Sequence, residues 1–97
     1  MENKYIRVNS DKFFNLKIEI GEVLGWLKAI REISGVEDLS AALEICYSYV
    51  LDKEQSRAVV IVTELIYQEA SGKIIPPINL YETYRNIAIG DCKDYAP

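Results

Sequence analysis

The side chains best suited to catalysis are scarce in this sequence. Histidine, the commonest general base, is absent from all 97 residues. No glycine-rich phosphate loop, nucleophile elbow or carboxylate cluster with metal-ligand spacing is present. The two cysteines, Cys46 and Cys92, supply too few soft ligands for a zinc site. We therefore expect no enzymatic activity, no metal site and no cofactor.

The remaining reactive groups have ordinary structural interpretations. Cys46 lies among apolar residues of a helical pattern, which favours a buried free thiol over a disulfide or a ligand. The glutamates are spread along predicted helix surfaces. Glu37 and Asp38 together suit the start of a helix, where negative charge is favourable, better than an acid-base pair.

Charge is distributed unevenly along the chain, whose formal net charge is −4. Residues 1–31 contain six Lys and Arg against four Asp and Glu, a net of +2, so residues 32–97 carry −6. The total argues against a generic binder of nucleic acid or anionic membranes. No basic-then-apolar leader opens the chain and no 18-residue uncharged run occurs, so we expect a soluble cytoplasmic protein without a membrane partner.

An alternating pattern over residues 13–20 predicts one short strand. One face carries apolar side chains and the other carries polar ones: Phe14, Leu16, Ile18 and Ile20 against Asn15, Lys17 and Glu19. Residues 5–8 form either a flexible arm or a short extra strand, and their pattern is too short to decide. With no clear second strand nearby, the strand is expected to pair with its own copy in a second chain.

Two amphipathic helices are predicted after the strand, over residues 22–34 and 38–51. Gly35 suits a left-handed C-terminal cap for the first helix, and Asp38 suits the N-cap of the second. The first apolar face includes Trp26 and Leu27. The second stripe consists of Leu39, Ala42, Leu43, Cys46, Tyr47 and Val50, widened by Ile45 and Tyr49.

The C-terminal half is predicted to be a helical extension of the same single domain, with helices over residues 54–71 and 79–89. Residues 52–56 are either a turn or the start of the first of these helices. β-Branched residues make a strand possible over 58–67, but the length of the pattern and the ending in Ser71-Gly72 favour a helix. Pro76 and Pro77 then break regular structure, and Asn79 suits an N-cap.

The strand and the two helices of residues 13–51 resemble the ribbon-helix-helix family of dimeric DNA-binding proteins, the Arc/MetJ type. Residues 14–17 are similar to the strand of that family, residues 22–35 to its first helix and glycine turn, and Ser40 to a small hydroxyl residue near the start of its second helix. The resemblance covers about 40 of the 97 residues. It implies a mainly α homodimer, possibly a higher oligomer, with a 13–51 core and a 52–97 extension.

The resemblance also implies roles for particular residues. Two copies of the strand would form a ribbon in the major groove of duplex DNA, with Asn15, Lys17 and Glu19 meeting base edges. The backbone around Leu39 and Ser40 would hold a phosphate, with Lys12 as a further phosphate contact. The dimer core would contain Phe14, Leu16, Ile18, Trp26, Leu27, Cys46 and Val50.

Two functional hypotheses follow. One is a dimeric transcriptional regulator that binds duplex DNA through the strand ribbon. The other is a small acidic module that binds another protein, as an inhibitor, an antitoxin-like factor or a phage-encoded host-modulating factor, and does not bind DNA. A protein partner would dock on residues 52–97, where the candidate surface residues are Tyr67, Tyr81, Tyr84 and Tyr95. At least two of these four tyrosines are expected to fill the core of the domain instead, and periodicity does not say which.

Overall fold

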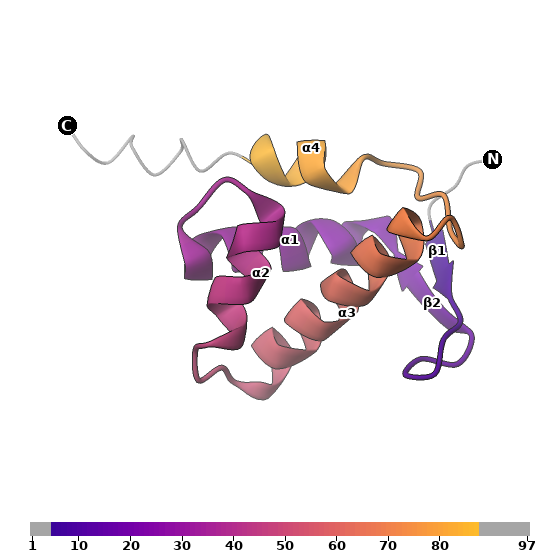
Figure 1. Cartoon of the computed structure of the whole chain (residues 1–97), viewed down its shortest axis with the longest axis horizontal. Coiled ribbons are helices and arrows are strands. Elements are labelled where there is room, and N and C mark those ends of the chain that lie inside the picture. Colours follow the sequence, from indigo (N-terminus) through magenta and orange to yellow (C-terminus); the bar gives the residue numbers. More distant parts are fainter. Residues whose placement is uncertain (1–4, 88–97) are drawn as a thin grey trace.

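In the computed structural model, which describes residues 5–87, an antiparallel pair of short strands leads into four helices (Figure 1). The strands are β1 (Tyr5–Val8) and β2 (Leu16–Glu19), and the helices are α1 (Ile20–Ser34), α2 (Leu39–Tyr47), α3 (Lys53–Ala70) and α4 (Leu80–Arg85). Helix α1 contacts β2 and the other three helices. The predicted mainly α class with a helical C-terminal extension is confirmed.

Strand β2 finds its partner within the same chain. It pairs antiparallel with β1, so that Ile6 faces Ile18 and Val8 faces Leu16 across the hairpin. Residues 5–8 are therefore a strand, because burying Ile6 and Val8 with Ile18 removes apolar surface from water. The expectation that no second strand is available was wrong, and it was the reason for pairing two copies of the chain. A ribbon between two chains stays a prediction, but an unpaired strand no longer supports it.

The strand is also shorter than predicted. Asn15 has φ 53°, a left-handed conformation that ends the alternation of side chains before Leu16. Phe14 consequently lies in the connection between the strands and is 86% exposed in the single chain, so its place in a dimer core stays a prediction. At the other end, Ile20 already belongs to α1. Only residues 16–19 of the predicted 13–20 are strand.

Helix α1 begins where the backbone N–H of Glu19 donates to the Glu22 carboxylate at 3.2 Å. It ends at Gly35, which has φ 73° and donates its N–H to the Arg31 carbonyl at 2.8 Å. This left-handed cap was predicted, and it suits glycine because a Cβ is strained in that conformation. Helix α2 then begins at the predicted cap, where the Asp38 carboxylate accepts from the Ala41 N–H at 2.9 Å.

Helix α2 ends four residues before the predicted position. The Ser48 hydroxyl donates to the Ile45 carbonyl at 2.7 Å, and the Tyr49 N–H donates to the Cys46 carbonyl at 3.1 Å, which turns the chain. Asp52 and Gln55 then form a reciprocal capping box that starts α3. Val50 therefore lies between two helices and is exposed in the single chain. Its predicted place in the helix was wrong, and its place in a dimer core stays a prediction.

The helical alternative for residues 58–67 is confirmed, because they lie in the middle of α3. This helix stops at Ala70, and Gly72 follows with φ 78°. After the proline-containing connection, the Asn79 side chain accepts from the Glu82 N–H at 2.9 Å and starts α4, as predicted. Helix α4 ends at Arg85 instead of continuing to residue 87, and the predicted residues 88 and 89 lie outside the described part of the chain.

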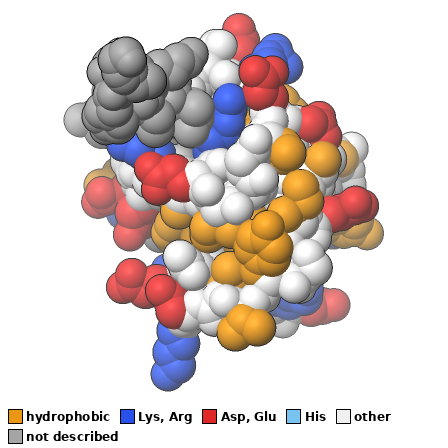
Figure 2. Space-filling view, turned by 90° about the vertical axis from the view of Figure 1, so that its left-hand side faces the viewer, with side chains coloured by type: hydrophobic (Ala, Val, Ile, Leu, Met, Phe, Trp, Pro, Cys, Tyr) orange, Lys and Arg blue, Asp and Glu red, His pale blue; other side chains and the backbone are white. Residues whose placement is uncertain are grey.

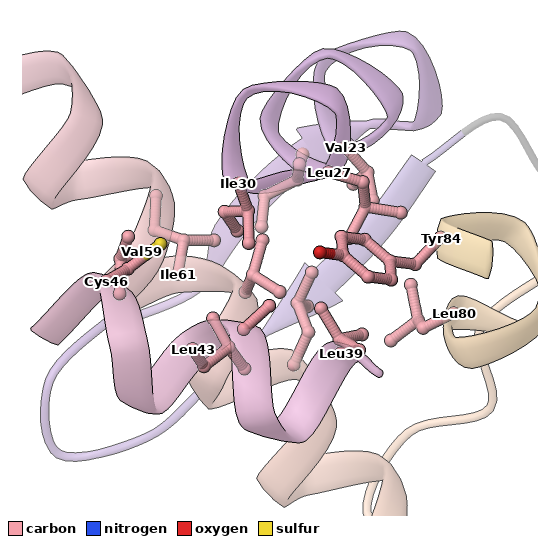
Figure 3. Close-up of a cluster of buried hydrophobic side chains, with 14 of the residues drawn as sticks. Val23, Leu27, Ile30, Leu39, Leu43, Cys46, Val59, Ile61, Leu80 and Tyr84 are labelled. Atoms are coloured by element: carbon pink, nitrogen blue, oxygen red, sulfur yellow. The ribbon is translucent and has the colours of Figure 1, made fainter. Parts of the chain in front are cut away.

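One apolar core lies among the hairpin and the helices, and Figure 3 shows part of it. Apolar side chains from all four helices meet there: Val23, Leu27, Ile30, Leu39, Leu43, Cys46, Val59, Ile61, Leu80 and Tyr84. Cys46 is buried and is a free thiol, and burial raises its pKa above the ordinary value of 9.0. Of the predicted dimer-core residues, Ile18, Leu27 and Cys46 fill this core, while Leu16 and Trp26 pack against it partly buried.

A buried polar contact ties α4 to α1. The Tyr84 hydroxyl donates to the Val36 carbonyl at 2.7 Å, and the Ser34 hydroxyl lies 3.1 Å from the Tyr84 oxygen. Arg31, 7% exposed, donates from Nη1 to the carbonyls of Tyr84 and Arg85 at 3.0 and 3.3 Å. The Arg31 guanidinium also lies 5.4 Å from the centre of the Tyr84 ring. Carbonyls at the end of a helix lack partners within it, so Arg31 satisfies the end of α4.

Candidate interaction surfaces

The outer face of the hairpin carries two of the three predicted base contacts. Tyr5 and Arg7 from β1 lie opposite Glu19 and Lys17 from β2, and all four side chains are exposed. Arg7 and Lys17 form a directly opposed pair of like charges, an arrangement that destabilises a sheet unless other contacts compensate.

Neighbouring groups separate the two charges. The Arg7 guanidinium donates to the Asn15 amide oxygen at 3.1 Å, and the Lys17 ammonium lies 4.1 Å from the centre of the Tyr5 ring. The third predicted base contact, Asn15, thus holds an arginine at the end of the hairpin. Tyr5 and Arg7 were not predicted as members of this face, because the pattern of residues 5–8 is too short to distinguish an arm from a strand.

The predicted phosphate contacts are not brought together. Lys12 lies in the β1–β2 connection, at a cleft of about 520 Å³ that also borders Thr63, Tyr67 and Lys73. Leu39 and Ser40 begin α2, which Figure 1 places away from the hairpin. A phosphate at these two residues would meet negative charge, since the Asp38 carboxylate already accepts from the helix N-terminus.

Apolar side chains are exposed at the turn between α2 and α3. We call residues 47–50 the α2–α3 corner; Tyr47 is 55% exposed, Tyr49 51% and Val50 103%. The Tyr47 hydroxyl donates to the Thr63 hydroxyl at 3.1 Å, and Thr63 donates in turn to the Val59 carbonyl at 2.7 Å. These bonds fix Tyr47 against α3. Figure 2 views the molecule from the side of α2, and hydrophobic side chains form a continuous area there.

Acidic side chains flank the corner. Glu44 is exposed on α2 one turn before Tyr47, and Asp52 and Glu54 are exposed just after Val50. Lys53 is the one basic residue between positions 44 and 54, so this segment has three negative charges and one positive charge, a net of −2. Figure 2 shows acidic side chains on both sides of the hydrophobic area. The corner is thus an apolar surface with an acidic rim.

The tyrosines predicted as a partner surface differ in their exposure to solvent. Tyr67 and Tyr81 are exposed, whereas Tyr84 is fully buried, so its assignment to a surface was wrong. Tyr84 faces the core because α4 packs this side against α1 and α2. Tyr95 lies outside the described residues. Tyr47 and Tyr49 were predicted to belong to the buried stripe of α2, but both are exposed. Ser48, which ends the helix, is the sequence feature that could have indicated this.

The described part of the chain holds neither a metal-ligand cluster nor a membrane-spanning helix. Between residues 5 and 87, no group of three or more His, Cys, Asp or Glu side chains is arranged to hold a metal ion. Within the same range, no helix is both long and apolar enough to cross a membrane. No protein-family model matches the chain, and no curated protein or solved structure is significantly similar to it.

Proposed function

We propose that this protein is a small interaction module that binds another protein through its α2–α3 corner. The observation that carries the proposal is the complete exposure of Val50 directly after two half-exposed tyrosines, Tyr47 and Tyr49. Burying apolar surface favours a complex, and an exposed apolar cluster with a polar rim is typical of a protein-binding site. The acidic rim of the corner supplies that polar border.

The local structure favours binding because the corner is held in place before a partner arrives. Hydrogen bonds from Ser48 and Tyr49 close the turn, and Tyr47 is fixed to Thr63. Tyrosine has few rotatable bonds for its contact area, so it loses little conformational entropy on binding. A preorganised apolar surface therefore retains more of its burial energy as affinity.

Photo-crosslinking tests this function. A benzophenone amino acid at Tyr49 is expected to give a discrete heteromeric adduct in cells that produce the protein, because Tyr49 lies in the proposed contact. The matched control places the same group at Ile75, which is 93% exposed but lies in the α3–α4 connection. Val50→Asp, which puts a charge into the contact, should abolish the adduct while the circular dichroism spectrum stays unchanged. No adduct at Tyr49, or the same adducts from Ile75, would refute the proposal.

A second candidate function is binding of duplex DNA by the hairpin. The observation that favours it is the opposed Arg7 and Lys17 pair, whose repulsion a phosphate backbone would relieve. A two-stranded ribbon is also a shape that the major groove admits. This candidate uses one chain for the ribbon, and the homodimer stays a prediction.

Salt dependence tests the DNA candidate. We expect Arg7→Ala combined with Lys17→Ala to reduce the slope of log affinity against log salt by about 2, because two phosphate contacts are lost. Fluorescence anisotropy with a random 20-base-pair duplex measures the slope. Lys53→Ala, an exposed lysine beside the corner, is the control and should change little. If the unmodified protein shows no salt-dependent affinity, the candidate fails.

A further inference from the structure

We infer that the partner of the α2–α3 corner is a basic amphipathic helix of another protein. This inference rests on the proposed function and specifies the chemistry of its ligand. Apolar side chains of the helix would cover Tyr47, Tyr49 and Val50, and its Lys and Arg side chains would meet the acidic rim.

Charge is the first argument for a cationic ligand. Three acidic side chains flank the corner and are exposed: Glu44, Asp52 and Glu54. One carboxylate oxygen of Asp52 accepts from the Gln55 N–H and caps α3, so Glu44 and Glu54 are the main acidic contacts for a partner. Complementary charge speeds association and excludes wrong partners, and like charge is unfavourable. A second copy of this chain would bring an identical acidic rim against the first. The charge pattern therefore favours a basic partner over self-association.

A cleft at the start of α3, the helix that follows the corner in the chain, is the argument for a helix. Glu54, four residues after Val50, lines a cleft of about 360 Å³ between α1 and the start of α3. Its lining includes the small residues Gly25, Ala29 and Ala58, and the space where a Gly25 Cβ would lie is open. Small residues let another helix approach closely, and amphipathic helices commonly bind by placing their apolar face in such a groove.

The electrostatics of the cleft agree with a cationic ligand. Glu22 and Glu54 border it, and its one basic residue, Arg57, lies 5.8 Å from the centre of the Trp26 ring. The Trp26 face thus already holds a guanidinium in this structure. Taken with Glu44, Asp52 and Lys53, the corner and cleft carry four acidic and two basic side chains, so the combined surface is negative.

The probe is a synthetic 18-residue Leu/Lys peptide that forms an amphipathic helix, titrated into the ¹⁵N-labelled full-length protein. We expect amide chemical-shift changes confined to residues 22–29 and 44–58, and an affinity that falls about tenfold between 50 and 300 mM salt. Val50→Ser should weaken binding about tenfold, the effect of losing a central apolar contact. Ile75→Ser, an equally exposed change outside the corner, should leave the affinity unchanged.

A peptide with Glu in place of every Lys separates charge from apolarity. Equal affinity for this peptide, or shift changes centred elsewhere, would overturn the inference. Self-association of the protein through the corner, seen as shift changes on dilution without peptide, would also overturn it in favour of a second copy. An adduct from Tyr49 combined with no Leu/Lys binding would retain the proposed function and reject only the basic helix.

Discussion

Replacing Tyr84 with alanine is expected to lower the free energy of unfolding by about 4 kcal/mol. The side chain is completely buried between α4 and the core, so alanine would leave a cavity as well as an unpaired Val36 carbonyl. Urea unfolding at pH 7, followed by circular dichroism, measures the change. Tyr67→Ala is the matched control, because Tyr67 is exposed on α3, and it should change stability by less than about 0.5 kcal/mol.

The phenylalanine variant separates the hydroxyl from the ring. Tyr84→Phe should lose about 1–2 kcal/mol, since the ring stays and only the bonds to Val36 and Ser34 disappear. Burial raises the pKa of Tyr84 above its ordinary value of 10.0, against smaller opposing effects of Ser34 and Arg31. The stabilisation linked to its proton is thus present below pH 10 and is lost as pH rises through the folded-state pKa.

The dependence of the free energy of unfolding on pH tests whether Tyr84 is a buried phenol with a raised pKa. Cys46 also has a raised pKa. The protein that retains Tyr84 and the Tyr84→Phe variant are therefore compared in a Cys46→Ala background, which removes the thiol. Tyr84→Phe should then lose less stability above pH 10 than the protein with Tyr84 does. An identical decline in the two proteins would mean that Tyr84 is not the buried phenol that this structure describes.

The second large effect is expected for Arg31→Ala, which should lower the free energy of unfolding by about 3 kcal/mol. The guanidinium is buried and satisfies the Tyr84 and Arg85 carbonyls, which would lose this donor in the variant. Arg31→Lys should recover part of the loss, because an ammonium keeps the charge but lacks the planar fork of the guanidinium. The same urea experiment measures these changes.

Lys28→Ala is the control for the charge itself, since Lys28 is exposed on α1, the helix that carries Arg31, and should contribute less than about 0.5 kcal/mol. Because Arg31 and Tyr84 are in contact, the double alanine variant should lose less than the sum of the single losses. A loss below 1 kcal/mol for Arg31→Ala, or strict additivity with Tyr84→Ala, would contradict the buried contact between α1 and α4.

The starts of α2 and α4 and the end of α1 were predictable from the sequence because they depend on a few adjacent residues. Asp38 and Asn79 accept from backbone N–H groups three residues ahead, and Gly35 adopts the left-handed cap conformation. Such caps need no tertiary partner. The end of α2 was harder, because its apolar spacing continues to Val50 while Ser48 and the Asp52 capping box stop the helix.

The candidate surfaces were less predictable, since spacing identifies an apolar stripe without identifying what covers it. Tyr47 and Tyr49 continue the stripe of α2, yet both are about half exposed, although the Tyr47 hydroxyl contacts Thr63 of α3. Tyr67 and Tyr84 are both tyrosines of C-terminal helices, and only the packing of α4 on α1 buries Tyr84 alone. The tertiary packing therefore decided which tyrosines are available to a partner.

For the predicted strand, too, the local sequence pattern determined one part of the structure and tertiary packing determined the other. The sequence by itself determined that residues 16–19 alternate and that helices follow, because side-chain direction along an extended backbone is a local property. Only the tertiary structure decided that β1 pairs with β2 in one chain, because this requires residues 9–15 to turn back and Ile6, Val8 and Ile18 to share a core. Contacts between residues distant in sequence depend on burial that local patterns do not specify.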